Sequence, residues 1–171
     1  MKAIIPKGFG PIVRLAVGER AKPTPGKNDV LVKVRAASVN PKDWKLNLSL
    51  ARAAPPVGRR FVPPLFGDDL AGEVVEVGAN VAGFEIGDRV MGIVGGGAAA
   101  ERCLLHEDIA MPIPDGVSLQ DAAAIPEAFL TAYDALVLQG GLSPGEWMAI
   151  NVVGSGVGTA ALQIARAIGA K

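Results

Sequence analysis

Three glycines near the carboxyl end of the chain have a spacing that could bind phosphate. Gly154, Gly156 and Gly158 lie in the stretch INVVGSGVGTAALQIARAIGAK, residues 150–171. A turn of small residues between a strand and a helix lets phosphate oxygens reach backbone N–H groups, where the helix dipole stabilises negative charge. The pattern G-x-G-x-x-G is not met, because Thr159 stands at its last position. The spacing alone therefore also fits a turn that only packs a helix on a sheet.

Side chains that bind metal ions are scarce. Cys103 is the only cysteine and His106 the only histidine, whereas zinc is held by several thiolates and imidazoles. Asp68 and Asp69 could contact a hard cation, but two adjacent carboxylates do not complete a site. We therefore expect no metal ion. A single cysteine also excludes an intrachain disulfide and favours a reducing compartment.

The first two-thirds of the sequence are typical of β-structure. Residues 28–40, NDVLVKVRAASVN, alternate so that Val30, Val32 and Val34 share one face, which predicts a strand with one buried side. LAGEVVEVGANV and FEIGDRVMGIV predict two more strands, with Gly87–Asp88 as a tight turn. Short strands separated by Gly and Pro predict a barrel or sandwich. An exposed excursion is expected at residues 49–64, and a flexible loop or strand edge at residues 92–101.

Helical sequence is expected after residue 117. Ser118 and Asp121 have the form of a capping box, and Pro126 should divide the region into two helices. WMAINVV, residues 147–153, is an apolar run that predicts a strand of a parallel sheet. A last helix should begin near Val157 with an inner apolar stripe of Val157, Ala161, Ile164, Ala165 and Ile168.

Charge and hydropathy argue against two classes of partner. Seventeen basic residues balance seventeen acidic ones, so there is no electrostatic basis for binding nucleic acid or an anionic membrane. Residues 147–165 carry no charge, but the glycines and polar side chains among them argue against a spanning helix. The N-terminal MKAIIPKGFG lacks the apolar core of a signal peptide. We expect a cytoplasmic protein.

Four regions spread over most of the chain carry a family resemblance. They are SVNPKDWK (38–45), GDDLAGEVVEVGANVAGFEIGDRV (67–90), AAAIPEAFLTAYDAL (122–136), and GLSPGE with GSGVGTAALQIARAIGA (141–170). They resemble the N-terminal half of a medium-chain dehydrogenase/reductase, in its zinc-free quinone-oxidoreductase branch. The resemblance implies an α/β fold with a mainly β N-terminal part. A GroES-like β-barrel would cover residues 1–117, and linking helices with the first βα unit of an incomplete Rossmann fold would cover residues 118–171.

The same resemblance implies an activity and a cofactor. Relatives transfer a hydride from NADPH to a quinone, enone or related carbonyl. Zinc members of the superfamily bind their metal with cysteine and a His-Glu pair, where this chain has Asn40 and Asp68–Asp69. The branch's glycine turn reads A-x-x-G-x-G, which here becomes Val153, Gly156 and Gly158. We expect a homodimer when the protein is full length.

Candidate site residues follow from the family's pattern. Asn40 and Asp43 are the catalytic candidates, and Asn40 is also expected to bind the cofactor. Trp44 stands where many relatives carry a tyrosine, which removes one proton donor. The other expected cofactor-binding residues are Thr131, Gly154, Ser155, Gly156, Val157 and Gly158.

The sequence leaves alternatives open for several residues and for the function. Thr131 could equally be an ordinary hydroxyl on a helix surface, and Tyr133, Phe129 and Trp147 are most simply core residues. A βαβ unit needs a second strand where this chain ends, so we expect a truncated piece of a longer protein. The alternatives to a quinone reductase are a catalytically inert module with a structural or association role, an enoyl-thioester reductase, or a relative of the zinc alcohol dehydrogenases.

Overall fold

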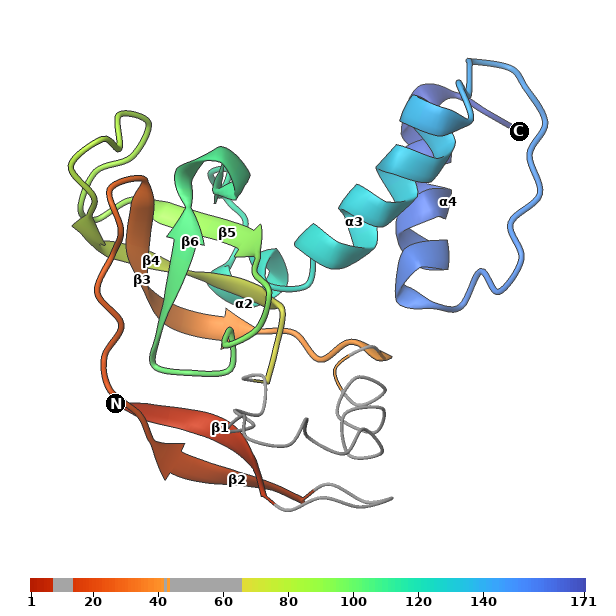
Figure 1. The fold of residues 1–171 in the computed structure, drawn as a ribbon. Coiled ribbons are helices and arrows are strands. Elements are labelled where there is room, and N and C mark those ends of the chain that lie inside the picture. Colours follow the sequence, from red (N-terminus) through yellow and green to blue (C-terminus); the bar gives the residue numbers. More distant parts are fainter. Residues whose placement is uncertain (8–13, 42, 44–65) are drawn as a thin grey trace, which may run out of the picture. The chain divides into compact units, whose positions relative to one another are not determined.

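The computed structural model describes residues 1–7, 14–41, 43 and 66–171. They form two compact units, Met1–Ala124 and Ile125–Lys171. Strands dominate the first unit and helices the second (Figure 1). Two features of the sequence, the expected excursion at residues 49–64 and the Trp44 substitution, lie outside the described residues.

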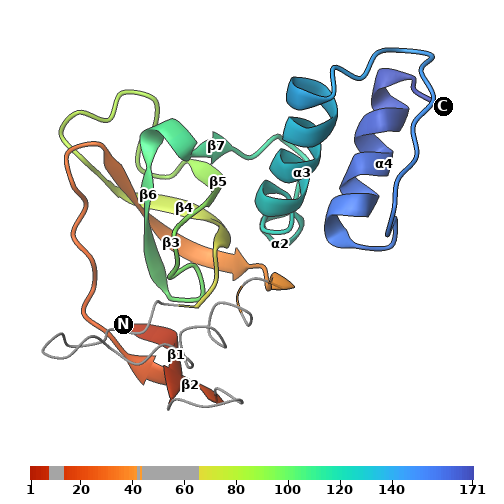
Figure 2. The same cartoon turned by 45° about the vertical axis from the view of Figure 1, so that its right-hand side comes forward.

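Antiparallel strands build the first unit (Figure 2). One pair consists of β1 (Lys2–Lys7) and β2 (Arg14–Glu19). A five-stranded sheet has the order β6-β3-β4-β5-β7. Its members are β3 (Asp29–Ala37), β4 (Asp69–Val77), β5 (Arg89–Ile93), β6 (Arg102–His106) and β7 (Met111–Pro112). The predicted strands over 28–40, 70–81 and 84–94 are thus present, with shifted ends.

Burial along β3 departs from the expected alternation. Val30, Leu31 and Val32 are all fully buried, although only the two valines were expected to face inward. The pairing with β4 has a register shift between Leu31 and Val32. Such an irregularity changes the face that successive side chains take. The core therefore gathers residues from β3, β4, β5 and β6, with Leu70 and Leu105 among its largest members.

Two connections behave much as their sequence suggests. Gly87 has a φ of +103°, a conformation that glycine adopts without steric cost, and it lies just before β5. Residues 94–101 are tied to the sheet rather than loose, because the Ile4 N–H donates to the Ala99 carbonyl at 2.8 Å and Ala3 bridges Ala100. Within the expected range 92–101, residues 92–93 belong to β5, Ala100 forms an isolated bridge with Ala3, and residues 94–99 form no strand, so the segment is mainly a connection with one edge contact.

Helices follow β7. They are α2 (Leu119–Ala122), α3 (Pro126–Tyr133), the π-helical η2 (Asp134–Gln139) and α4 (Gly156–Ile168). The predicted cap is confirmed, since Ser118 Oγ accepts the Asp121 N–H at 3.0 Å. Pro126 begins α3, as expected of a residue without a backbone donor. Because α2 contacts β3 and β4, it belongs to the first compact unit.

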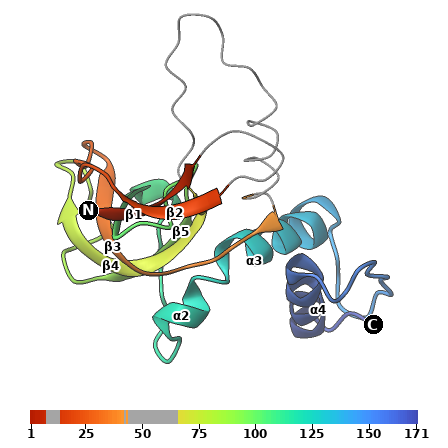
Figure 3. The same ribbon diagram turned by 90° about the horizontal axis from the view of Figure 1, so that it is seen from below.

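Small side chains join α3 to α4. Ala132, Ala160 and Ala161 form the buried cluster between them, and the two helices pack along each other (Figures 2 and 3). The expected stripe of α4 is only partly correct. Ala161 and Ala165 are buried, but Val157 is exposed, whereas Gly158 and Ala160 are buried. Small residues form the buried centre of this contact, and larger side chains such as Phe129 and Ile164 pack against it.

The predicted strand over residues 147–153 is wrong. Residues 147–150 have no regular structure and residues 151–154 form turns. A parallel strand needs a neighbour for its hydrogen bonds. The described residues supply one such position: the Met148 N–H donates to the Lys171 carbonyl at 3.0 Å, and the Lys171 N–H to the Glu146 carbonyl at 2.8 Å. This is the bonding pattern of a parallel ladder, but it involves too few residues to fix a strand.

Two aromatic residues expected in the core are on the surface. Trp147 is 82% exposed and Tyr133 is 47% exposed. Trp147 lies in the segment that does not form a strand, and Tyr133 ends α3 on a side that α4 does not cover. Phe129, in contrast, packs against the α3–α4 cluster as expected. In the part of the chain that is described, no helix is both long and apolar enough to cross a membrane.

Candidate functional site

Asn40 lies in a network of hydrogen bonds beyond the end of β3. Its Nδ2 atom donates to Ser38 Oγ at 2.9 Å and to Asp69 Oδ2 at 2.8 Å. Ser38 Oγ donates to the same Asp69 oxygen at 2.6 Å. The antiparallel register places Ala37 opposite Leu70 and so brings the start of β4 beside these residues. Asp69 is only 1% exposed, and a buried carboxylate needs such donors to offset its lost hydration.

Asp43 orients Asn40 through two reciprocal bonds. The Asn40 backbone N–H donates to Asp43 Oδ2 at 2.7 Å, and the Asp43 N–H donates to the Asn40 carbonyl at 3.0 Å. An acidic side chain that reaches back over three residues is the arrangement of a capping box. Asp43 is 5% exposed. Its observed contacts make Asp43 a positioning residue for Asn40.

The bonds of Asn40 decide what its side chain can offer a ligand. Both hydrogens of Nδ2 are directed at Ser38 and Asp69, and the Ser38 hydroxyl hydrogen points at Asp69. Asn40 Oδ1 accepts no hydrogen bond from the described residues. The side chain therefore presents an acceptor, suited to a hydroxyl or amide N–H of a ligand, rather than a donor for an oxyanion.

The glycine turn lies in the second unit and opens α4. Ser155 caps the helix, because its Oγ accepts the Gly158 N–H at 3.0 Å. The N–H groups of Gly156 and Val157 belong to the first turn, where a helix supplies no acceptor of its own. Two of the orphan donors of α4 are thus left for a ligand. Negative charge at this end is also stabilised by the helix dipole.

The three glycines of this turn have different surroundings. A Cβ atom at Gly154 would meet nothing within 4 Å, and one at Gly156 would only touch the Ala128 Cβ at 4.0 Å. A Cβ atom at Gly158 would lie 2.5 Å from the Val152 carbonyl oxygen and 2.7 Å from the Val153 Cα. Gly158 is required by the close approach of this backbone, whereas Gly154 and Gly156 border open space.

A strained residue precedes the turn, and the sequence gives no sign of it. Val152 has a φ of +56°, a region that costs L-residues roughly 1–2 kcal/mol and is unusual for a β-branched side chain. Its carbonyl accepts the Ser155 N–H at 2.9 Å. The bend at Val152 thus holds the start of the glycine turn.

The candidate residues fall into two groups. Asn40 and Asp43 lie together in the first unit. Gly154, Ser155, Gly156, Val157 and Gly158 lie together in the second. Thr131 is also in the second unit, exposed on α3, one turn after Ala128, whose Cβ lies 4.0 Å from the position that a Cβ atom at Gly156 would take. Sequence reasoning missed Ser38 as a member of the network and Asp69 as its acceptor, although both lie in the stretches that carry the family resemblance.

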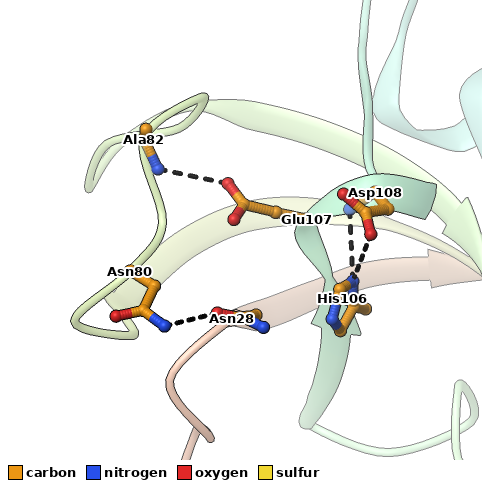
Figure 4. A network of polar contacts seen from close by, with 6 residues as sticks. All are labelled: Asn28, Asn80, Ala82, His106, Glu107 and Asp108. Atoms are coloured by element: carbon orange, nitrogen blue, oxygen red, sulfur yellow. Dashed lines mark hydrogen bonds and ion pairs between the residues drawn. The ribbon is translucent and has the colours of Figure 1, made fainter.

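Polar contacts around His106 are structural (Figure 4). His106 Nδ1 accepts the Asp108 N–H at 3.3 Å and so caps η1 (Glu107–Ile109). Glu107 Oε2 accepts the Ala82 N–H at 3.1 Å, which ties this turn to the loop after β4. His106 is therefore a surface residue, as expected. Among the described residues, no group of three His, Cys, Asp or Glu side chains could hold a metal ion.

Cys103 is a buried thiol of β6. Burial raises the pKa of Cys103 from 9.0 to about 11, and the contact of its sulfur with the Leu104 carbonyl only partly offsets this. Because the thiolate is the reactive species, Cys103 should be inert at neutral pH.

We expect this pKa to reduce stability in alkaline solution. The unfolded thiol loses its proton near pH 9 and the folded one near pH 11, so the contribution is complete below pH 9 and is lost as the pH rises toward 11. The loss is at most about 1.4 kcal/mol per pH unit. Urea unfolding at several pH values would measure it, with Cys103→Val as the control. Equal slopes for both proteins would contradict the assignment.

Comparison with known families gives a match in the first unit. The sequence profile described as "Alcohol dehydrogenase GroES-like domain" matches residues 26–115. The "Chloroplast envelope quinone oxidoreductase homolog" of Arabidopsis thaliana is 40% identical over 152 residues, which are 84% of this chain and 45% of that protein. The "Trans-enoyl reductase tazE" of Aspergillus terreus is 34% identical and covers 98% of this chain and 59% of its own length.

Solved structures extend the likeness to both units. A quinone oxidoreductase from Pseudomonas syringae pv. Tomato DC3000 matches with a TM-score of 0.83 and 33% identity, over 99% of this chain and 51% of that one. A mycobacterial protein complexed with NADPH matches with a TM-score of 0.84 and 28% identity, over 100% of this chain and 51% of that one. The chain spans about half the length of most of these relatives.

Proposed function

Because this chain belongs to the alcohol dehydrogenase GroES-like family, in the quinone-oxidoreductase branch of the medium-chain dehydrogenases/reductases, we propose that the full-length protein is an NADPH-dependent reductase. Its substrate would be a quinone, an enone or a related carbonyl, and the reaction would use no catalytic zinc. The observation that carries the proposal is the first turn of α4, where Gly154 and Gly156 border open space beside helix amides that find no acceptor among the described residues.

The residues of this turn fit a dinucleotide. Its pyrophosphate would bind at the N–H groups of Gly156 and Val157, with Gly154 leaving room for the oxygens. The likeness to a structure complexed with NADPH supports the choice of cofactor. Bound NADPH would supply the hydride, and water the proton, so that a quinone takes up both and leaves as the hydroquinone. Val153, in place of the branch's alanine, would narrow the approach to the turn.

In the first unit, Asn40 would serve as a hydrogen-bond acceptor for the cofactor or the substrate. With Nδ2 held by Ser38 and Asp69, its Oδ1 is the atom left to receive a hydroxyl or amide hydrogen of the cofactor or substrate. Asp43 fixes the backbone of Asn40 and so the direction of that oxygen. Rigid positioning of reacting groups is a large source of rate enhancement.

The donor set around Asn40 supports a reaction without zinc. Zinc sites use thiolates and imidazoles, whereas the contacts here are those of an amide, a hydroxyl and a carboxylate already bound to one another. Cys103 and His106 lie on β6 and are engaged in the core and in the cap of η1.

A kinetic assay on the full-length protein tests this proposal. We expect oxidation of NADPH with 1,4-benzoquinone, slower oxidation of NADH, and no change after prolonged treatment with a chelator. Loss of activity on chelation, restored by zinc, would instead indicate a zinc alcohol dehydrogenase. Failure of the full-length protein to oxidise NADPH with any acceptor of the panel would contradict the proposal.

An enoyl-thioester reductase is the second candidate, favoured by the match to a trans-enoyl reductase over almost the whole chain. Crotonyl thioesters belong in the same panel, and a preference for them over quinones would select this function. The hypothesis of an inert module is tested by titrating the 171-residue chain with NADPH and following its tryptophan fluorescence. Micromolar binding would exclude inertness of this piece.

A further inference from the structure

A pocket of about 450 Å³ lies in the first unit, outside the hydrogen-bond network of Asn40. It is lined by residues after β2 and by β6 with the loop before it, including Arg20, Gly96, Gly97, Arg102, Cys103 and Leu104. Its volume is in the range of sites that bind small organic molecules. None of the pocket residues takes part in the network of Asn40.

Backbone hydrogen bonds hold this pocket in shape. The Arg20 N–H donates to the Met1 carbonyl at 2.9 Å, so the chain after β2 is fixed to the start of β1. The Glu101 N–H donates to the Lys2 carbonyl at 3.0 Å, which fixes β1 to the segment that enters β6. A ligand would therefore enter a site that is already formed, which lowers the entropic cost of binding.

Two arginines of the pocket lack counter-ions. Neither Arg20 nor Arg102 forms an ion pair with a described residue. Their acidic neighbours in sequence are engaged elsewhere: Glu19 pairs with the N-terminal ammonium at 3.3 Å, and Glu101 Oε2 accepts the Lys2 N–H at 2.8 Å.

Arg20 carries a further sign of a missing partner. Its Nε atom is buried and has no hydrogen-bond acceptor. An unsatisfied buried donor is costly, and more so in a charged group. Because Nε itself is inaccessible, an acceptor in the pocket would offset this cost by pairing with the Nη atoms of the same charged guanidinium.

We propose that this pocket binds a small organic carboxylate. The carboxylate would bond to the guanidinium groups of Arg20 and Arg102, since the planar fork of arginine matches the two oxygens. The apolar body would lie against Leu104 and Cys103, while Gly96 and Gly97 contribute no side chain that would fill the space. The mostly apolar lining favours an organic anion over inorganic phosphate, whose additional oxygens would lose hydration against apolar atoms.

Calorimetric titration of the intact protein with benzoate tests the proposal. Benzyl alcohol keeps the apolar body without the charge, and inorganic phosphate keeps the charge without the body; we expect both to bind more weakly than benzoate. Arg20→Gln and Arg102→Gln should each weaken benzoate binding about tenfold, the loss expected of one charge-assisted hydrogen bond. Arg14→Gln, an exposed arginine of β2 outside the pocket, should leave the affinity unchanged.

Amide resonances of glycine-labelled protein give a reading that needs no variant. Benzoate should shift Gly96 and Gly97 and leave Gly116, which lies outside the pocket, in place. Absence of benzoate binding, equal affinity of both arginine variants and wild type, or shifts confined to other glycines would overturn the proposal. Tighter binding of phosphate than of benzoate would overturn the organic part of it. The test involves no hydride transfer, so its outcome is independent of the reductase assay.

Discussion

Gly158→Ala is expected to destabilise the second unit by about 1–3 kcal/mol, the usual cost of forcing a methyl group into packed structure. The added Cβ would lie 2.5 Å from the Val152 carbonyl oxygen and 2.7 Å from the Val153 Cα. Backbone atoms cannot rotate away as a flexible side chain can, so the N-terminus of α4 must separate from residues 152–153. Chemical denaturation followed by circular dichroism would measure the loss.

Gly154→Ala is the matched control, because it makes the same change in the same turn. Its Cβ would meet nothing within 4 Å, so stability should stay within about 0.5 kcal/mol of wild type. If the open space takes a pyrophosphate, however, the full-length Gly154→Ala protein should bind NADPH more weakly. Equal stability of both variants would contradict the packing role of Gly158. Unchanged NADPH affinity of Gly154→Ala would contradict the placement of the phosphates.

Asp69→Ala is expected to have the largest effect in the first unit, a loss of roughly 2–3 kcal/mol of unfolding free energy. The change removes the acceptor shared by Ser38 Oγ and Asn40 Nδ2. Both part-buried donors then lose this hydrogen bond. Asp69→Asn keeps the shape and one oxygen acceptor, so it should cost less. Thermal and urea unfolding of the two variants would rank them.

An exposed aspartate provides the comparison. The Asp108 side chain is 82% exposed, so Asp108→Ala should change stability by no more than about 0.5 kcal/mol. A loss for Asp69→Ala as small as this would mean that the network does not depend on the carboxylate. In the full-length protein, Asp69→Ala should also lower the kcat of the proposed reductase, because Asn40 Nδ2 would lose the acceptor that holds it in one orientation.

The two groups of candidate residues have distinct physical roles. Among the described residues around Asn40, hydrogen bonds occupy both Nδ2 hydrogens and leave Oδ1 without a donor. At the start of α4, the helix leaves donors and the glycines leave space. An acceptor for hydroxyl or amide hydrogens in the first unit and a set of donors suited to phosphate in the second are two separate features, one in each unit. The variants above test each part by itself.

Local patterns in the sequence were sufficient for much of the fold. Alternating apolar residues placed β3, β4 and β5, and Ser118 with Pro126 placed the starts of α2 and α3. The solved relatives confirm the GroES-like domain and the beginning of a Rossmann fold that the resemblance implied. These features depend on residues close together in the chain, so their conformational preferences can be read from a short stretch of sequence.

The sequence by itself determined the β-rich first part, the capped helices, and a glycine turn at the start of the last helix. Tertiary structure decided which apolar segments become strands, because residues 147–153 have a strand's composition but find almost no hydrogen-bond partner among the described residues. It also decided the roles of individual site residues. The bonds that turn Asn40 into an acceptor come from Asp69, 29 positions along the chain, and a pattern of neighbours in sequence contains no record of that contact.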